Sequence, residues 1–543
     1  MIGARTLKKK GTNCPNCGGP VEFRFGGTMV AVCEFCHSAI ARGDREVELI
    51  GKVSDLVETD SVVRLGSTGK YRGKPFECIG RVQYQHAAGG YWDEWYLRLP
   101  GDRIAWLADA QGQLQLTFPR RIDRRISVPD FNAINLGDSI SLGDTDLTVM
   151  EKGTATALTA QGEIPWEFRP GDDHVYVDLR GQDNWFATIE YDAPQKPDGK
   201  RSLAVGKTVS LADLHLDAPA VEPLASDSIR RVQAVQLNCP QCGGPLDLRT
   251  PDQTMRVGCP NCGALLDVND GKLRVLKTLD DRLVKPSIPL GSVGRFQCRD
   301  KVSDHEFTLI GCMDRYAMYQ GTAYPWREYL LHNPEIGFRW LVENDRHWSF
   351  VEPVTDGDFN HHFEYHQSLQ YSGRSYRLYD RGRAYVRSCM GEFYWRVNQG
   401  DVVSTSDYIS PPYMLSFEAS KSGKTEELNI SHGVYLTVDE VKAAFQLENL
   451  TRPWGVGPIQ PSPAIHIGVW LAWVAFMAFI TMMHVLGGVW FHAPGQAGPD
   501  PWMWFYAMIF VSVVPLGIMA YKYHFETQRW KDSDYSPYPT VET

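Results

Sequence analysis

Short runs of aromatic, β-branched and other apolar residues predict that most of the chain forms β-strands. Examples lie at residues 76–79, 94–99 and 376–379. Clusters of Pro, Gly and Asp, such as residues 170–173, separate such runs as turns do. Strict alternation of polar and apolar positions is patchy, so the pattern predicts the fold class, mainly β, rather than the strand boundaries.

Two long apolar runs near the C-terminus predict a pair of transmembrane helices, one from Ile465 to Phe491 and one from Trp502 to Tyr521. At 1.5 Å per residue, either run can cross a hydrocarbon core of about 30 Å. The ten-residue connector lacks Lys and Arg, whereas Lys522 follows the second run. The positive-inside rule therefore places both chain ends in the cytoplasm. We expect both runs to contact lipid in a two-span protein of a bacterial inner membrane.

A short helix is expected just before the first apolar run. Thr437 and Glu440 have the spacing of a capping box, and residues 441–447 continue with apolar side chains at helical spacing. The prolines between residues 453 and 463 then predict a stiff approach to the membrane.

A long internal repeat organises the rest of the chain. Residues 14–20 return as 239–245, and residues 162–166 return as 391–395, with an offset of about 225 to 234 residues throughout. The repeat predicts two copies of one unit, a zinc ribbon followed by a β-rich domain. The expected division is ribbon 1 (1–45), β-rich copy 1 (46–193), linker (194–236), ribbon 2 (237–271), β-rich copy 2 (272–420), helix and Pro-rich segment (421–463), two transmembrane helices (464–522) and cytoplasmic tail (523–543).

Four Cys-x-x-Cys pairs provide the strongest chemical signal. Fifteen residues separate the pairs of the first ribbon and sixteen those of the second. Four thiolates around one ion close a tetrahedral zinc site and replace the core that so short a segment cannot build. We therefore predict two structural zinc ions; a redox dithiol or an iron centre is the alternative. The predicted ligands are Cys14, Cys17, Cys33 and Cys36 in ribbon 1, and Cys239, Cys242, Cys259 and Cys262 in ribbon 2.

Composition and charge limit the remaining possibilities. Thiols kept for metal binding indicate a reducing compartment, and no signal peptide precedes the first ribbon. A formal charge of −10 argues against a dedicated nucleic-acid-binding protein, although binding through the ribbons stays an alternative. No phosphate-binding loop, nucleophile elbow or metalloprotease motif is present, so we predict no catalytic residues and no enzyme.

One further motif occurs in both copies. Glu94 follows Trp92, and Glu328 follows Trp326, at the same spacing within an aromatic run. A carboxylate among aromatic rings can bind an organic cation through charge and cation–π attraction. The alternative is a strand in which the rings are buried and the acid is exposed or structurally paired.

The cysteine pairs, the two β units, residues 435–445 and the membrane hairpin together resemble a bacterial family of uncharacterised domains, number four-one-seven-eight. The resemblance covers most of the chain and implies tandem domains and an inner-membrane location. The resemblance also implies neighbouring genes that resemble polyamine biosynthesis and membrane-stress functions, and it implies no activity.

The function expected from the sequence is a membrane-anchored cytoplasmic scaffold that binds a protein partner. The first alternative is a sensor for a small organic cation such as a polyamine, using Glu94 and Glu328. The second alternative is nucleic-acid binding through the zinc ribbons.

Overall fold

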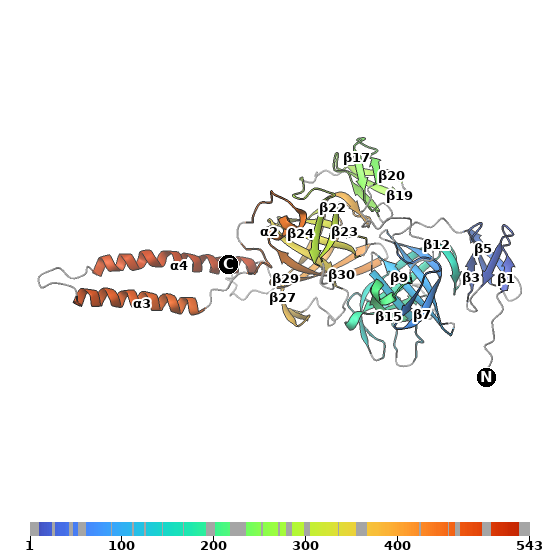
Figure 1. Ribbon diagram of the computed structural model, residues 1–543, viewed down its shortest axis with the longest axis horizontal. Helices are drawn as coiled ribbons and strands as arrows, with labels where there is room; N and C mark the ends of the chain where they lie inside the picture. Colours follow the sequence, from blue (N-terminus) through green and yellow to red (C-terminus); the bar gives the residue numbers. More distant parts are fainter. Residues whose placement is uncertain are drawn as a thin grey trace.

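The structure is a computed structural model (Figure 1). It describes residues 10–23, 28–42, 47–52, 61–87, 90–101, 103–110, 113–123, 126–143, 145–166, 168–191, 201–217, 235–250, 254–269, 272–278, 285–297, 304–334, 336–354, 366–422, 425–453, 456–461, 467–490 and 501–531.

The first copy folds into a closed ring of eight antiparallel strands, called barrel 1. Because each strand pairs with two neighbours, the ring leaves no open sheet edge over most of its length. In order around the ring, the strands are β7 (Lys74–His86), β8 (Tyr91–Leu99), β9 (Arg103–Ala110), β10 (Gln113–Pro119), β15 (Arg201–Val209), β14 (Trp185–Tyr191), β13 (Asp173–Arg180) and β12 (Asp146–Ile164).

The second copy repeats this ring as barrel 2, with the same strand order and pairing. The strands are β22 (Asp304–Tyr319), β23 (Thr322–Asn333), β24 (Gly337–Asn344), β25 (His347–Pro353), β30 (Thr425–Leu436), β29 (Tyr413–Ser422), β28 (Val402–Ser410) and β27 (Arg374–Phe393). The mainly β fold class and the duplication predicted from the sequence are therefore confirmed.

Each barrel carries the same small additions. A short strand pairs with the first long strand of each ring, and another pairs with the fifth strand in chain order. A helix follows the last strand of each ring and begins at a capping box, the second of which is the predicted Thr437–Glu440 pair. These elements are β6 (Thr68–Tyr71), β11 (Ser139–Ser141), α1 (Leu211–Leu214), β21 (Val293–Gln297), β26 (Ser368–Tyr371), α2 (Val438–Phe445) and the 3-10 turns Phe131–Ala133 and Gln182–Asn184.

The apolar cores lie where these additions cover the sheets. Leu214 of α1 packs with Trp95 and Leu107 of barrel 1, and Phe445 of α2 packs with Phe296 and Phe350 of barrel 2. The buried residue of α1 is Leu214 and those of α2 are Val438, Val441 and Phe445, so each helix places apolar side chains against the strands.

Each ribbon consists of a two-stranded hairpin and a small three-stranded sheet. Ribbon 1 comprises β1 (Lys10–Asn13), β2 (Pro20–Phe23), β3 (Val30–Val32), β4 (Ser38–Arg42) and β5 (Val47–Lys52). Ribbon 2 comprises β16 (Val235–Asn238), β17 (Pro245–Leu248), β18 (Arg256–Gly258), β19 (Ala264–Asn269) and β20 (Lys272–Thr278).

The two barrels join along a short seam. Glu151 and Lys152 of β12 pair with Glu427 and Glu426 of β30, at the point where each strand has left its neighbour in its own barrel. Met150 of β12 packs inside an apolar cluster that otherwise belongs almost entirely to barrel 2. The seam therefore joins both sheets and cores.

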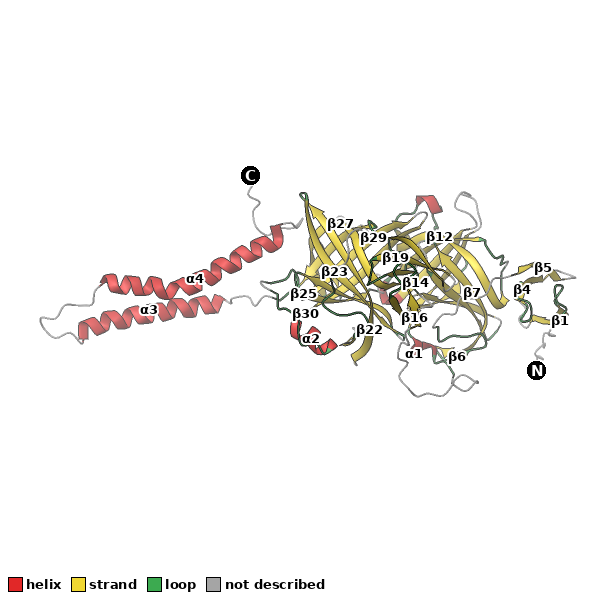
Figure 2. Cartoon of the chain, turned by 90° about the horizontal axis from the view of Figure 1, so that it is seen from above, coloured by secondary structure: helices red, strands yellow, loops and turns green. Residues whose placement is uncertain are grey.

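Two helices, α3 (Ile467–Trp490) and α4 (Pro501–Lys531), project away from the barrels and lie side by side (Figures 1 and 2). His484 of α3 stacks on Trp504 of α4, with ring centroids 4.7 Å apart. Within the described helices, one segment, Trp502–Lys522, is long and apolar enough to cross a membrane, and the apolar stretch Leu471–His484 is shorter.

Several predicted boundaries are wrong. Residues 201–217, assigned to the linker, form β15 and α1, because Leu203 and Val205 continue the barrel after the turn-like sequence at 194–199. Barrel 2 extends beyond residue 420, because β30 closes the ring. Both ribbons continue past their predicted ends through β5 and β20. Residues 532–543 of the predicted tail lie outside the described residues.

Candidate functional site

The eight predicted metal ligands meet in two separate clusters of four thiols. In each cluster the four sulfur atoms lie within 4.8 Å of one another. The Sγ atoms of Cys14 and Cys36 are 3.5 Å apart, and those of Cys239 and Cys262 are 3.8 Å apart. The structure therefore brings together the same two sets of four cysteines that the sequence predicted.

This geometry fits a tetrahedral metal ion. A zinc–sulfur bond of about 2.3 Å requires tetrahedral sulfur atoms roughly 3.8 Å apart, close to the observed spacings. Backbone N–H groups of Gly19 and Gly244 each donate to a cysteine sulfur at 3.4 Å, which stabilises negative charge on the thiolate. With all four positions filled by protein, such an ion would hold the ribbon together and would have no open position for catalysis.

A buried glutamate fixes each ribbon to its barrel, a role that the sequence interpretation missed. Glu392, 1% exposed, accepts hydrogen bonds from the backbone N–H groups of Arg249 and Thr250 at 2.7 and 2.8 Å, and from the Thr254 hydroxyl at 2.9 Å. Glu163 occupies the equivalent place in barrel 1 and accepts from Thr28. Both glutamates belong to the repeated Gly-Glu motif, which was the available signal.

The two repeated aromatic–acid motifs point into the barrel lumens. Trp92 on β8 lies 5.9 Å from Tyr176 on β13, although β7 and β12 separate these strands in the ring. Arg315 on β22 contacts Glu418 on β29, although β27 and β28 lie between them. Side chains on non-adjacent strands can meet in this way only inside the ring. An eight-stranded barrel encloses enough space for one small ligand.

Among the described residues, the hydrogen-bond donors to Glu94 in the lumen of barrel 1 are neutral. Trp92 donates through Nε1–H at 3.5 Å, and the Tyr96 hydroxyl donates at 3.1 Å. Burial, reinforced by the nearby charge of Glu190, raises the pKa of Glu94 to about 8. Among the residues that the structure describes, no Lys, Arg or His forms an ion pair with Glu94.

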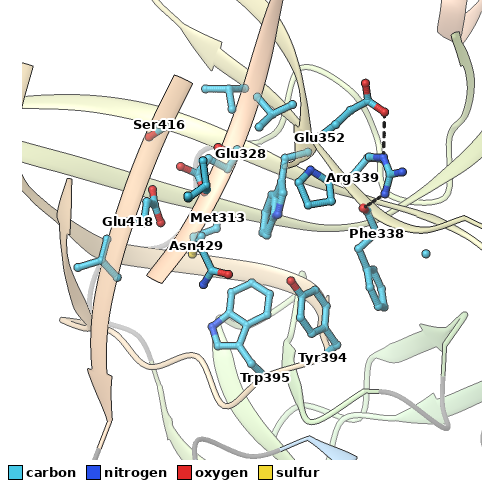
Figure 3. Close-up of a pocket in the computed structure, with 18 of the residues that line it drawn as sticks. Met313, Glu328, Phe338, Arg339, Glu352, Tyr394, Trp395, Ser416, Glu418 and Asn429 are labelled. Atoms are coloured by element: carbon cyan, nitrogen blue, oxygen red, sulfur yellow. Dashed lines mark hydrogen bonds and ion pairs between the residues drawn. The ribbon is translucent and has the colours of Figure 1, made fainter. Parts of the chain in front are cut away.

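Glu328 in barrel 2 has the same aromatic donor but a different partner. Trp326 donates through Nε1–H at 2.7 Å, and Arg315 forms an ion pair at 2.9 Å. Arg315 forms a second ion pair at 2.9 Å with Glu418. Figure 3 shows Glu328, Glu418 and Met313 gathered in this part of the pocket. Glu328 is therefore a structurally paired acid, which is the alternative interpretation of the motif given above.

One cavity of about 2440 Å³ reaches both lumens. Its wall includes Trp92 and Glu94 of barrel 1 together with Arg315 and Glu328 of barrel 2. Glu94 is thus enclosed by the barrel wall yet accessible from within the cavity. The structure brings the two predicted ligand-binding residues to one cavity but places them in separate barrels.

Both copies of the duplicated unit match one known protein family. Residues 64–211 and 302–438 match a family described as a domain of unknown function, DUF4178, and together make up more than half of the chain. The chain belongs to the DUF4178 family. No match is found among curated proteins or among solved structures. Because the two segments cover the rings, each barrel is one DUF4178 domain and the ribbons lie outside it.

The seam between the two DUF4178 domains contains a second group of buried ionisable residues. His86 contacts Glu151 at 3.0 Å, and Tyr176 donates to the same carboxylate. Burial, with Glu151 nearby, raises the pKa of both Asp178 and Glu427 to about 7. Glu151 and Glu427 lie opposite one another in the sheet, which places like charges together. No sequence pattern marks this group, because its members come from strands far apart along the chain.

Proposed function

We propose that this protein is a membrane-associated, non-catalytic binding protein whose first DUF4178 domain takes up a small organic cation. The observation that carries this proposal is the Glu94 carboxyl, enclosed among Trp92, Tyr96 and Tyr84 without a cationic partner in the described part of the chain.

Physical chemistry favours a cation at this position. Burial penalises the charged carboxylate, and a cation bound beside it would favour the charged form and offset part of that penalty. Trp92 offers an electron-rich ring face beside the carboxylate, and Tyr84 stacks on it with centroids 5.1 Å apart. The aromatic and apolar residues around Glu94 lower the local dielectric, which strengthens both attractions.

The remaining features supply anchoring and rigidity in this proposal. Zinc in the two thiol clusters would hold the ribbons, which Glu163 and Glu392 connect to the barrels. Helices α3 and α4 would form a two-span hairpin in a bacterial inner membrane, with the barrels on the cytoplasmic side. The absence of Lys and Arg from the connector supports this orientation.

Calorimetry of the detergent-solubilised full-length protein tests the proposal. We expect spermidine or a simple alkylammonium ion to bind, and Glu94→Gln to weaken that binding at least tenfold. Asp146→Asn, which removes an exposed carboxylate from the same barrel, is the matched control and should leave binding unchanged. Absence of binding by every organic cation, or equal binding by Glu94→Gln, would refute the proposal.

The protein-binding scaffold expected from the sequence stays a prediction. Affinity purification from solubilised membranes should recover one reproducible partner, and a consistently solitary protein would count against it.

A further inference from the structure

The identical strand order of the barrels allows their lumens to be compared position by position. In barrel 1, Trp92 lies opposite Tyr84 in the sheet; in barrel 2, the equivalent Trp326 lies opposite Arg315. Arg315 therefore occupies the position of Tyr84. Both residues lie at the same register relative to the glutamate of the repeated motif.

A second pair of acids is also equivalent. On β13 and β14 of barrel 1, Thr188 donates to Asp178 at 2.7 Å, and Glu190 follows two residues later. On β28 and β29 of barrel 2, Ser416 donates to Asp407, and Glu418 follows two residues later. The acids Glu94 and Glu190 of barrel 1 thus correspond to Glu328 and Glu418 of barrel 2.

In barrel 2 this acid pair already binds a cation that belongs to the chain. The guanidinium of Arg315 makes ion pairs of 2.9 Å with both Glu328 and Glu418, and its central carbon lies 5.6 Å from the centre of the Trp326 ring. Although burial opposes the charge, the two carboxylates raise the pKa of Arg315 and keep it protonated. Two carboxylates and a tryptophan are therefore arranged around one guanidinium.

In barrel 1 the same two carboxylates and tryptophan are present, and Tyr84 stands at the position from which Arg315 supplies the guanidinium in barrel 2. Tyr84 is neutral, and Glu190 accepts only a hydroxyl hydrogen bond from Ser202, at 2.6 Å, among the contacts of the described residues. Trp92 and Glu94 line the cavity, so a ligand inside it can reach them.

We infer that barrel 1 binds a ligand carrying a guanidinium group, held between Glu94 and Glu190 beside Trp92 as Arg315 is held in barrel 2. This inference rests on the proposed cation-binding function and specifies its ligand class. It also assigns one such site to each chain, because barrel 2 is filled by its own side chain.

The arrangement selects a guanidinium over an ammonium ion. A guanidinium is planar, spreads its donors around a fork and can bridge two carboxylates while lying against an aromatic ring. An ammonium ion is compact and strongly hydrated, so it loses more hydration on entering the lumen and bridges two walls less well.

Titration of the solubilised full-length protein with n-butylguanidinium and n-butylammonium tests this inference. We expect one site per chain and an affinity at least tenfold higher for n-butylguanidinium. Glu94→Gln and Glu190→Gln should each reduce that affinity tenfold or more, with Asp146→Asn unchanged. Equal affinity for the two ions would overturn the inference and leave the proposed function standing. No binding of these ions or of spermidine would overturn both.

Substitutions at the equivalent positions Tyr84 and Arg315 give an independent test. Tyr84→Arg should supply barrel 1 with its own guanidinium and reduce n-butylguanidinium binding at least tenfold. Arg315→Ala should open a second site, so that n-butylguanidinium raises the melting temperature of this variant more than that of the wild type, and n-butylammonium does not. Unchanged binding by folded Tyr84→Arg, or no selective stabilisation of Arg315→Ala, would overturn the assignment.

Discussion

The pH dependence of stability should reveal the unusual environment of Glu94. Its pKa rises from an ordinary value of 4.5 to about 8 because the carboxyl is buried and Glu190 lies nearby. Between these two pH values the unfolded chain releases the proton and the folded chain retains it. Stability in the absence of ligand therefore falls as pH rises through this window. Glu94→Gln removes the titrating group while preserving the acceptor for Trp92 and Tyr96.

The size of the effect follows from the width of the window. One pKa unit corresponds to about 1.4 kcal/mol. The raised pKa of Glu94 therefore lowers the free energy of unfolding at pH 7 by about 3 kcal/mol. Glu94→Gln should recover this amount at pH 7 and almost nothing at pH 4.5. For a domain of this size, the gain corresponds to a rise in melting temperature of roughly 6 to 12 °C at pH 7.

Thermal unfolding of the solubilised full-length protein at several pH values measures this directly. The quantity of interest is the difference in melting temperature between Glu94→Gln and wild type. Asp178 and Glu427 titrate in both proteins, so their contributions cancel in this difference. A difference that grows steadily from pH 4.5 to 8 is expected. A difference that stays constant with pH, or a variant that is less stable at pH 7, would refute the account of Glu94 as a buried acid without a cation.

Three further predictions concern the structural framework. Removing metal with a strong chelator should lower the melting temperature of the barrels as well as unfold the ribbons, since β3 and β18 pair with barrel strands; ribbons that unfold without any effect on the barrels would contradict this. Glu392→Ala should destabilise ribbon 2 by about 2 to 4 kcal/mol, because a buried and a half-buried backbone N–H group lose their acceptor; limited proteolysis should show faster cleavage in ribbon 2 than in ribbon 1, and equal rates would contradict the assignment. Gly153→Ala should cost about 1 to 3 kcal/mol in thermal unfolding, because its Cβ would lie 2.6 Å from the Thr425 hydroxyl oxygen across the seam; the loss should be smaller when Thr425→Ala is also present, and an undiminished loss would argue against the seam.

The sequence predicted the features that depend on local spacing. The cysteine pairs predicted both thiol clusters, because ligand spacing within a knuckle is a local property. The capping box at Thr437 was likewise local, and the repeat predicted the duplication. Closure of each ring was beyond prediction, because it depends on pairing between strands far apart along the chain, such as β10 with β15.

The candidate site shows the same division. The motif around Glu94 and Glu328 was visible as an acid among aromatic residues. The decisive difference between the copies lies at Tyr84 and Arg315, on a different strand from either motif, and its meaning depends on the register of the sheet. Glu190 and Glu418 were equally hidden, because neither stands in a recognisable pattern.

Strand β12 imposes a condition on how this protein can be divided. Its C-terminal end pairs with ribbon 1, its middle forms the wall of the first lumen, and Glu151 and Lys152 in its N-terminal half pair with the other barrel. Cutting the chain between the two repeats would leave an unpaired sheet edge on each half and expose Met150 to water. Single-repeat fragments should therefore aggregate when expressed separately, and a productive split requires both halves to be produced together.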